Sequence, residues 1–579
     1  MTAFPLPQAL RMPLLLGLLP FALLLLTIVT AGRDLLVWDE WVVWSELLAR
    51  IDDAGLRFPD LLAQHNEQRM LPPRLVGLAF MPFFQLNRFA EYFFNAALAA
   101  CTCLALCSLY VRTLAPRRDI WRFGVSALAL FCFSLTQWET FLVGLNINIS
   151  CTTLGMVLGA WLVSREPLGR LRMAALLVAG FLASFDMING LLYWPALLPA
   201  IALAGKPGRK WRMALWLAAG TACWVGYFYG FIPSGHHPNI FQTLAQPLRL
   251  LAFFFTTLGA ACVSDPDLWI LPLLLGLSAC LLLLRNLLTL WRHDKDALRV
   301  LLPWLCLLVF ALLSAAAISV GRSLIRDMGY AQQSRYVTLC IPFWAALLAL
   351  DASAAAVSAG ASWLRRARAV FWGLILTCIV VTNIGLFFHL QEKGHFQDAM
   401  HRELFRLQDE ALLLRLFPDP VYLAAHLPLF LKYRLSPYNR IGELASYSRL
   451  PVPPKDLRAE FHATPEDRGF GGLPGFRLQG TAFLVQARQP AKMLFLLRGE
   501  QIVYAGAVEA DGAFALFMPV TQLASGLHTL EAWALLPDGK LVPVGGKFQL
   551  DVPDYVPKWT TVHKRFSFPE RKQSAFSGQ

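Results

Sequence analysis

Residues 12–31 read MPLLLGLLPFALLLLTIVTA and contain no charged side chain. A run of about 20 apolar residues is long enough to cross the hydrocarbon core of a bilayer. Residues 268–284, LWILPLLLGLSACLLLL, have the same character. Both runs predict helices that span a membrane.

The composition of the whole chain supports this prediction. Only 15% of the 579 residues are charged, and the mean hydropathy is +0.51, whereas soluble domains carry about 25% charged residues. The sequence therefore predicts a polytopic α-helical membrane protein and excludes a soluble enzyme. No P-loop pattern is present, which argues against an ATPase. All 11 cysteines precede residue 389 and none forms a C-x-x-C pair, so a disulfide framework is not expected.

The number and orientation of the spans follow from the apolar runs and from the basic residues between them. Residues 1–389 carry a net charge of +10, and residues 390–579 carry +3. Lys and Arg are retained on the cytoplasmic side, which predicts a cytoplasmic N-terminus and a C-terminal part outside. The segment Leu248–Val263 is expected to be re-entrant or interfacial, because counting it as a span would place the basic residues Arg292 and Lys295 outside instead of in the cytoplasm. About eleven spans are expected, at 11–32, 89–111, 120–136, 146–164, 171–187, 190–204, 212–232, 268–290, 299–320, 337–357 and 369–389.

Beyond the last span the pattern changes from apolar runs to charged helices and then to short alternating strands. Helices are expected over 391–416 and 421–433, and strands near 481–487, 493–497, 501–505, 514–519, 528–535 and 547–552. Short strands separated by turn signals indicate a small antiparallel sandwich of immunoglobulin-like type. The predicted organisation is a transmembrane domain 1–390, a helical extracytoplasmic segment 391–450, a linker 451–475, a sandwich 476–552 and a disordered basic tail 553–579.

The first outer loop, residues 33–73, is too polar and aromatic for a simple connector. It follows the first span with GRDLLVWDEW, residues 32–41. Tryptophans at 38, 41 and 44 have helical spacing and predict a helix that lies in the membrane interface. A second helix is expected over Asp60–Met70, ended by Pro72 and Pro73, with His65 and Arg69 on one face.

These features resemble the GT-C superfamily of integral-membrane glycosyltransferases. The resemblance rests on the acidic pair Asp39-Glu40 in the first outer loop, on AQHNEQRMLPPRL at 63–75, and on the GR…SRY loop at 321–336. It covers roughly residues 10–390. The resemblance implies that Asp39 acts as catalytic base, with Glu40 as a less suitable substitute. It leaves a divalent cation, Mg²⁺ or Mn²⁺, open, because the loop contains no convincing D-x-D.

Transfer from a polyprenyl-phosphate sugar needs a carboxylate base for the acceptor hydroxyl and cations for the phosphate leaving group. Arginine suits phosphate, although arginines at helix ends also anchor to lipid head groups. Neither His236-His237 nor Asp265/Asp267 is expected to bind metal, and no metal ligand is assigned. The candidate phosphate-binding residues are Arg69, Arg74, Arg322, Arg326 and Arg335, and the candidate pocket residues are His65, Asn66, Glu67, Glu139, Asp186 and Tyr336. For Asp186 the alternative is helix capping.

The sequence therefore predicts a glycosyltransferase that moves a sugar from a polyprenyl-phosphate donor onto a cell-envelope glycan, lipid or protein. The expected location is a bacterial cytoplasmic membrane, with no nucleic-acid partner. Two alternatives stay open at this point. One is an O-antigen polymerase or ligase-like enzyme, and the other is a transporter or flippase of lipid-linked glycans, which would usually show internal repeats.

Overall fold

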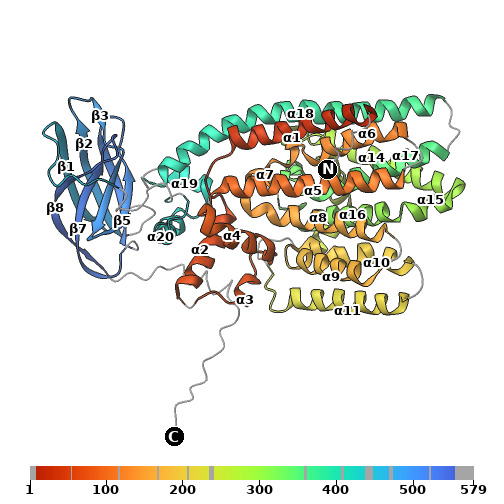
Figure 1. Cartoon of the computed structure of the whole chain (residues 1–579), viewed down its shortest axis with the longest axis horizontal. Coiled ribbons are helices and arrows are strands. Elements are labelled where there is room, and N and C mark those ends of the chain that lie inside the picture. The colour runs from red at the N-terminus through yellow and green to blue at the C-terminus, as the bar shows by residue number, and fades with distance from the viewer. Residues whose placement is uncertain are drawn as a thin grey trace, which may run out of the picture.

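A long helical bundle and a β-sandwich lie at opposite ends of the molecule, with short helices between them (Figure 1). The computed structural model describes residues 8–53, 55–114, 118–165, 168–204, 208–233, 240–325, 327–357, 362–405, 410–436, 438, 447–467, 474–520 and 523–553. The predicted tail 553–579 lies outside these residues except for its first position.

Each predicted span falls on a helix of the bundle. These helices are α1 (Gln8–Ala31), α5 (Arg88–Thr113), α6 (Arg118–Cys132), α8 (Ile147–Val163), α9 (Arg170–Ser184), α10 (Tyr193–Leu203), α11 (Arg209–Phe228), α14 (Ile270–His293), α16 (Leu302–Arg322), α17 (Ser334–Val357) and α18 (Ser362–Glu403). Within the described residues, seven stretches are long and apolar enough to cross a membrane: Arg88–Thr113, Phe123–Leu142, Gly144–Val163, Ile270–His293, Leu302–Arg322, Ser334–Val357 and Trp363–Glu403. The prediction of a polytopic helical membrane protein is confirmed, and the number of eleven spans stays a prediction.

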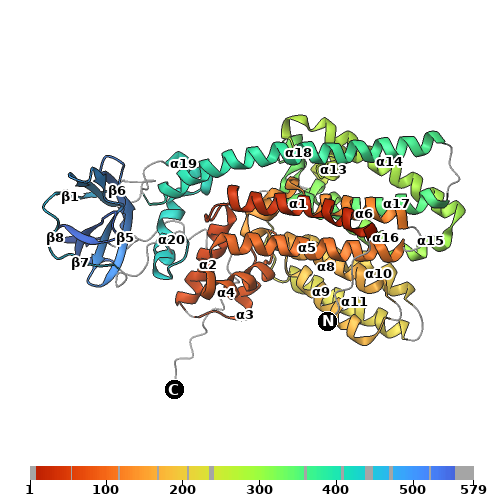
Figure 2. The same cartoon turned by 45° about the horizontal axis from the view of Figure 1, so that its top comes forward.

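Helix α17 is the centre of the bundle, because nearly all of its residues up to Ala354 are buried. The ring of Trp344 stacks on Phe131 of α6 with centroids 5.4 Å apart, and its indole nitrogen donates to the Leu258 carbonyl. That carbonyl belongs to α13 (Pro247–Gly259), which follows the short α12 (Ile240–Leu244). Helix α13 packs tightly on α14, on the side of the bundle next to α18 (Figure 2). Its 13 residues are fewer than a bilayer span requires.

The first outer loop folds differently from the expected pair of helices. Its helices are α2 (Asp39–Asp53), α3 (Phe58–Leu61) and α4 (Leu71–Phe84). The second predicted helix, Asp60–Met70, is wrong, because Pro72 and Pro73 begin α4 instead of ending a helix. Proline is tolerated in the first turn of a helix, where its missing N–H has no partner to lose.

The tryptophans of α2 face protein, which corrects the expectation of a helix lying on lipid. Trp41 and Trp44 are both buried. Trp41 packs against Phe430 of α20 (Pro420–Lys432), and the hydroxyl of Ser45 hydrogen-bonds the hydroxyl of Tyr422 on the same helix. Helix α2 is therefore held between the bundle and the C-terminal helices.

The last span continues beyond the bundle, toward the sandwich, as a single helix (Figure 1). Helix α18 contains 42 residues, so the predicted boundary at residue 390 falls inside it, and the predicted helix 391–416 is in fact the end of α18 followed by α19 (Glu410–Leu416). Arg33 donates to Asp398 at 2.7 Å, which ties this extension to the start of the first outer loop.

The C-terminal domain is a sandwich of two antiparallel four-stranded sheets, as predicted. One sheet contains β1 (Leu457–Glu466), β2 (Gly475–Leu484), β3 (Gln489–Pro490) and β6 (Ala513–Pro519), and the other has the order β5 (Gln501–Ala507), β4 (Met493–Arg498), β7 (Gly526–Leu535) and β8 (Leu541–Val552). The structure corrects the expected linker 451–475, because β1 lies inside it. Exposed polar residues alternate with half-buried ones along β1, so its apolar signal is weak.

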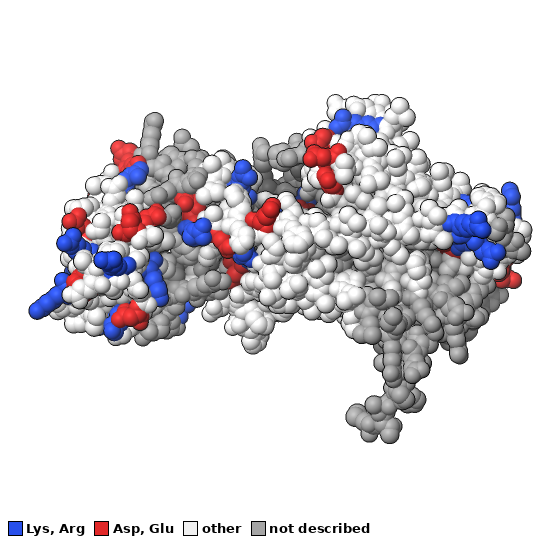
Figure 3. Space-filling model, turned by 90° about the horizontal axis from the view of Figure 1, so that it is seen from above, with Lys and Arg blue, Asp and Glu red and all other residues white. Residues whose placement is uncertain are grey.

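The surface charge divides the molecule along its length. In the face seen in Figure 3, charged residues cover the sandwich and the end of the bundle farthest from it, where Lys and Arg gather. Mostly uncharged residues cover the stretch between. This arrangement fits a bundle whose middle is surrounded by lipid.

The contact between α4 and α2 leaves no room for a side chain at Gly77. A Cβ there would lie 1.8 Å from the ring carbon Cη2 of buried Trp44. We expect Gly77→Ala to lower the free energy of unfolding by about 1–3 kcal/mol, because the core is overpacked, measured as thermal unfolding in detergent. Gly373→Ala on α18, where nothing lies within 4 Å, is the control and should not lower stability. Equal shifts for the two variants would contradict this packing.

Candidate functional site

A cavity lies where the loop of residues 33–73 meets the start of α8, the end of α16 and the start of α17. Its empty volume, including the open mouth, is about 780 Å³. Seven predicted residues from four separate segments line it: Asp39, Glu40, Asn66, Glu67, Arg322, Arg335 and Tyr336. The structure therefore brings together the acidic pair's first member, the HNE block and the GR…SRY loop.

Asp39 is the first residue of α2, and its side chain is 53% exposed. His65 Nε2 lies 3.6 Å from one carboxylate oxygen, and the Asn66 amide donates to the same oxygen at 3.4 Å. Burial by surrounding protein raises the pKa of Asp39, but the contact with the His65 imidazole and the charges of Arg335 and Arg322 outweigh burial and lower this pKa below its ordinary value. Asp39 is therefore a carboxylate at neutral pH.

The cations of the cavity come from the two ends of one loop. Arg322 ends α16 and lies 3.4 Å from the carboxylate of Glu67. Arg335 is near the start of α17, and its guanidinium donates to the Tyr330 hydroxyl at 3.3 Å. Tyr330 belongs to the short helix η5 (Met328–Gln332). The cavity thus holds two guanidiniums together with the carboxylate of Asp39, and one of the guanidiniums, that of Arg322, also pairs with Glu67. Guanidiniums next to a carboxylate suit a phosphate bound beside a base.

Glu40 has a different environment from Asp39. It has no exposed surface, and its carboxylate accepts from the backbone N–H groups of Val37 at 2.8 Å and Leu145 at 3.1 Å. Arg88 lies 3.4 Å from Glu40 and 2.7 Å from Glu91. Glu40 forms part of the cavity wall, but these contacts favour a role in positioning α2 over the predicted role as an alternative base.

Arg69 and Arg74 lie outside the cavity, in contrast to the expectation that they bind phosphate. Both are buried. Arg69 donates to the carbonyls of Tyr227 and Tyr229, and Arg74 donates to those of Leu61 and Ala63. Arg69 thus satisfies carbonyls at the C-terminal end of α11, and Arg74 satisfies carbonyls in the loop around the end of α3. His65 and Arg69 are accordingly not on one helical face.

The remaining predicted residues do not line this cavity or lie outside the described part of the chain. Glu139 lies in the first turn of α7 (Trp138–Leu142), outside this cavity, and its carboxylate accepts from the Arg335 backbone N–H at 3.0 Å. Asp186 is fully buried, its side chain accepts from Thr152 at 3.0 Å, and it does not line the cavity. Asp265 caps the short helix η4 (Pro266–Leu268), as expected for a structural role. Arg326 and His236-His237 lie outside the described residues.

The part of the chain that the structure describes holds no group of three His, Cys, Asp or Glu side chains arranged to bind a metal ion. This finding concerns protein ligands alone.

Sequence reasoning missed the polar residues that complete the cavity wall. Gln68 accepts a hydrogen bond from the Asn148 amide, and Asn146 donates to the Glu139 carbonyl from the turn η2 (Gly144–Asn146). Three wall residues also have left-handed backbone angles: Trp38 (φ 52°), Asn66 (φ 49°) and Met70 (φ 50°). Such angles cost about 1–3 kcal/mol in most non-glycine residues and concentrate at functional sites. No local sequence signal predicts them.

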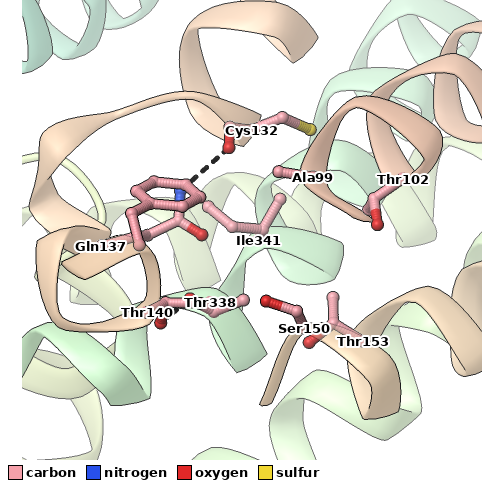
Figure 4. Close-up of a pocket in the computed structure, with 10 residues that line it drawn as sticks. Ala99, Thr102, Cys132, Gln137, Thr140, Ser150, Thr153, Thr338 and Ile341 are labelled. Atoms are coloured by element: carbon pink, nitrogen blue, oxygen red, sulfur yellow. Dashed lines mark hydrogen bonds between the residues drawn. The ribbon is translucent and has the colours of Figure 1, made fainter. Parts of the chain in front are cut away.

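Two further cavities adjoin this region. One is a small space within the bundle, shown in Figure 4, that is lined by the hydroxyl residues Thr140, Ser150, Thr153 and Thr338 and by Gln137, whose amide donates to the Cys132 carbonyl. The other is a wide groove of about 1540 Å³ including open space, between α18 and residues 263–271. Its walls are mostly apolar, and it also contains Glu139 and Ser334, the residue before Arg335.

The stability of the fold should depend on the buried cluster of Glu40, Arg88 and Glu91. Arg88→Met removes the cation from between two buried carboxylates, so we expect it to lower the free energy of unfolding by about 3–5 kcal/mol, measured by thermal unfolding in detergent. Arg50→Met breaks the partly exposed pair with Asp60 and should cost about 1 kcal/mol or less. An Arg88→Met variant as stable as Arg50→Met would show that the cluster does not hold α2 in place.

Comparison with known proteins adds little beyond this geometry. No family model matches the sequence, and no curated protein matches it. The chain is similar to the crystal structure of ArnT from Cupriavidus metallidurans in the apo state, with a TM-score of 0.37 and 16% sequence identity over 68% of this chain and 80% of that one. The assignment of function therefore rests on the residues that line the cavity.

Proposed function

We propose that this protein is a glycosyltransferase of the GT-C type that transfers a sugar from a polyprenyl-phosphate donor to an acceptor outside the membrane. One observation carries the proposal: the carboxylate of Asp39 shares a cavity with the guanidiniums of Arg322 and Arg335. A base and two phosphate-binding cations are the groups that such a transfer needs.

The surroundings of Arg335 support a lipid-linked donor. The apolar groove along α18 reaches Ser334, which directly precedes Arg335. A polyprenyl chain in this groove would place its phosphate at Arg335 and Arg322, and the attached sugar would then extend toward Asp39. An apolar chain gains free energy from such a surface.

In the proposed reaction the acceptor hydroxyl oxygen attacks the anomeric carbon of the donor sugar. As the new C–O bond forms, Asp39 takes the hydroxyl proton. The bond between the anomeric carbon and the phosphate oxygen breaks, and its electron pair leaves with the polyprenyl phosphate. The two guanidiniums stabilise the extra negative charge on that phosphate. Asn66 and His65 hold the Asp39 carboxylate in position.

The orientation of the chain belongs to the same proposal. Basic residues at the end of the bundle farthest from the sandwich would face the cytoplasm, so the cavity and the sandwich would lie outside a bacterial cytoplasmic membrane. The acceptor is a component of the cell envelope, either a glycan, a lipid or a protein.

Replacing the base tests the proposal. We expect Asp39→Asn to lower the transfer rate by about 10²–10⁴-fold, because an amide cannot accept the proton. The measurement is mass spectrometry of envelope glycans from a deletion strain that carries wild type or variant at equal expression. Asp52→Asn, at the other end of α2 and paired with Lys432, is the control. The proposal is supported if wild type and Asp52→Asn restore the missing sugar and Asp39→Asn does not. Full restoration by Asp39→Asn would show that Asp39 is not the base.

The contacts of Asp39 also predict a pH dependence. Because His65 lowers the pKa of Asp39, the base stays ionised well into the acidic range, and transfer should fall only when the pH drops through that lowered value. His65→Ala removes the strongest of these lowering contacts, so the acidic limb of the kcat/KM profile should move to higher pH. An unchanged acidic limb in an active His65→Ala variant would contradict the contact between the two side chains.

A further inference from the structure

Another cavity, distinct from the small space of Figure 4 and from the groove along α18, adjoins the Asp39 cavity on the side of the C-terminal helices and is here called the second cavity. Its empty volume, including open space, is about 460 Å³. Val37, Trp38 and Val143 line both cavities, while α7, α18 and α19 supply the other walls. These elements lie next to one another where the bundle meets the outer helices (Figure 1).

The second cavity is positively charged and partly aromatic. The ammonium of Lys393 lies 3.5 Å from the ring centre of Trp138 and 5.5 Å from that of Trp38. Arg415 also lines the cavity and packs over the ring of Phe396 at 5.2 Å. No Asp or Glu is among the described residues of its wall, and no described carboxylate lies within salt-bridge distance of Lys393. Lys393 is half-buried and Arg415 is exposed, and the charge of Glu139 acts on Lys393 only from beyond salt-bridge distance. Two cations placed in this way attract an anion.

Trp38 separates the two cavities and is held in an unusual way. Its backbone has a φ of 52°, and its N–H donates to the Leu416 carbonyl of α19 at 2.8 Å. This hydrogen bond stabilises a conformation that a bulky residue rarely adopts. The residue that follows is Asp39, so a ligand next to Trp38 in the second cavity would lie close to the proposed base.

We propose that the second cavity binds an anionic sugar unit, a saccharide with a phosphate or a carboxylate group. Lys393 and Arg415 bind the anionic group, the indole of Trp38 packs against the C–H face of the sugar ring, and the amide of Gln397 pairs with hydroxyls. Identifying this unit as part of the acceptor rests on the proposed function, whereas the binding itself does not. The acceptor class would then be an acidic envelope glycan or a glycolipid.

The experiment is saturation-transfer NMR on the purified full-length protein in nanodiscs, with glucose 6-phosphate, glucuronate and glucose as probes. We expect at least one of the two anionic sugars to bind tenfold or more tightly than glucose. Lys393→Gln should weaken that binding fivefold or more, and Lys393→Arg should retain it. Lys432→Gln changes an exposed lysine outside the cavity and should have no effect. Preference for the phosphate or for the carboxylate identifies the anion.

Equal binding of glucose and both anions, binding to none of them, or unchanged binding in Lys393→Gln would overturn the proposal. If Lys393→Gln unfolds at the same temperature as wild type and Lys393→Arg still binds the sugar, the weaker binding of Lys393→Gln is due to the lost cation and not to misfolding. The Asp39→Asn variant separates the two proposals, because it should still bind the anionic sugar. Full transfer activity in Asp39→Asn would contradict the proposed role of Asp39 as the base but would say nothing against the second cavity. Loss of anionic-sugar binding in Lys393→Gln would still support the second cavity in that case.

Discussion

The arrangement of this protein depends on a buried ion cluster at the outer edge of the bundle. Arg88, at the start of α5, lies between the carboxylates of Glu40 and Glu91, and all three side chains are buried. Charges at a membrane boundary are costly unless they are paired. The carboxylate of Glu40 also accepts hydrogen bonds from the backbone N–H groups of Val37 and Leu145. The cluster therefore joins the first outer loop, α5 and the turn before α8 at one point.

This constraint explains why two adjacent acidic residues have different environments. Successive residues of an α-helix point about 100° apart, so when Glu40 is fixed in the cluster, Asp39 must point elsewhere. Asp39 faces the cavity, where His65 and Asn66 contact it and where Arg322 and Arg335 lie opposite. The C-terminal helices hold the same loop from the other side, through Trp41 and Phe430 and through the hydrogen bond from Trp38 to Leu416.

Much of this architecture could be predicted from the sequence, because apolar runs, basic clusters and alternating strands have strong local signals. The sequence also indicated the cavity residues Asp39, Asn66, Glu67, Arg322, Arg335 and Tyr336, since polar groups at the outer ends of several spans converge in a bundle. The sequence does not distinguish an arginine that faces a ligand from one that donates to backbone carbonyls. For this reason it wrongly predicts that Arg69 and Arg74 bind phosphate. The pair Pro72-Pro73 is ambiguous for a similar reason, because proline is found both after the end of a helix and in its first turn. The role of Lys393 depends on Trp38 and Trp138, which are far from it in the chain.

The central claim is that the cavity beside Asp39 receives the phosphate of a polyprenyl-linked donor. Native mass spectrometry of the purified protein with undecaprenyl phosphate tests it most directly. The account predicts a lipid adduct on wild type that is lost when Arg322 and Arg335 are both changed to Gln, and that persists in Arg69→Gln if this variant folds. An adduct of equal abundance in the double variant would show that the phosphate binds elsewhere and would contradict the account.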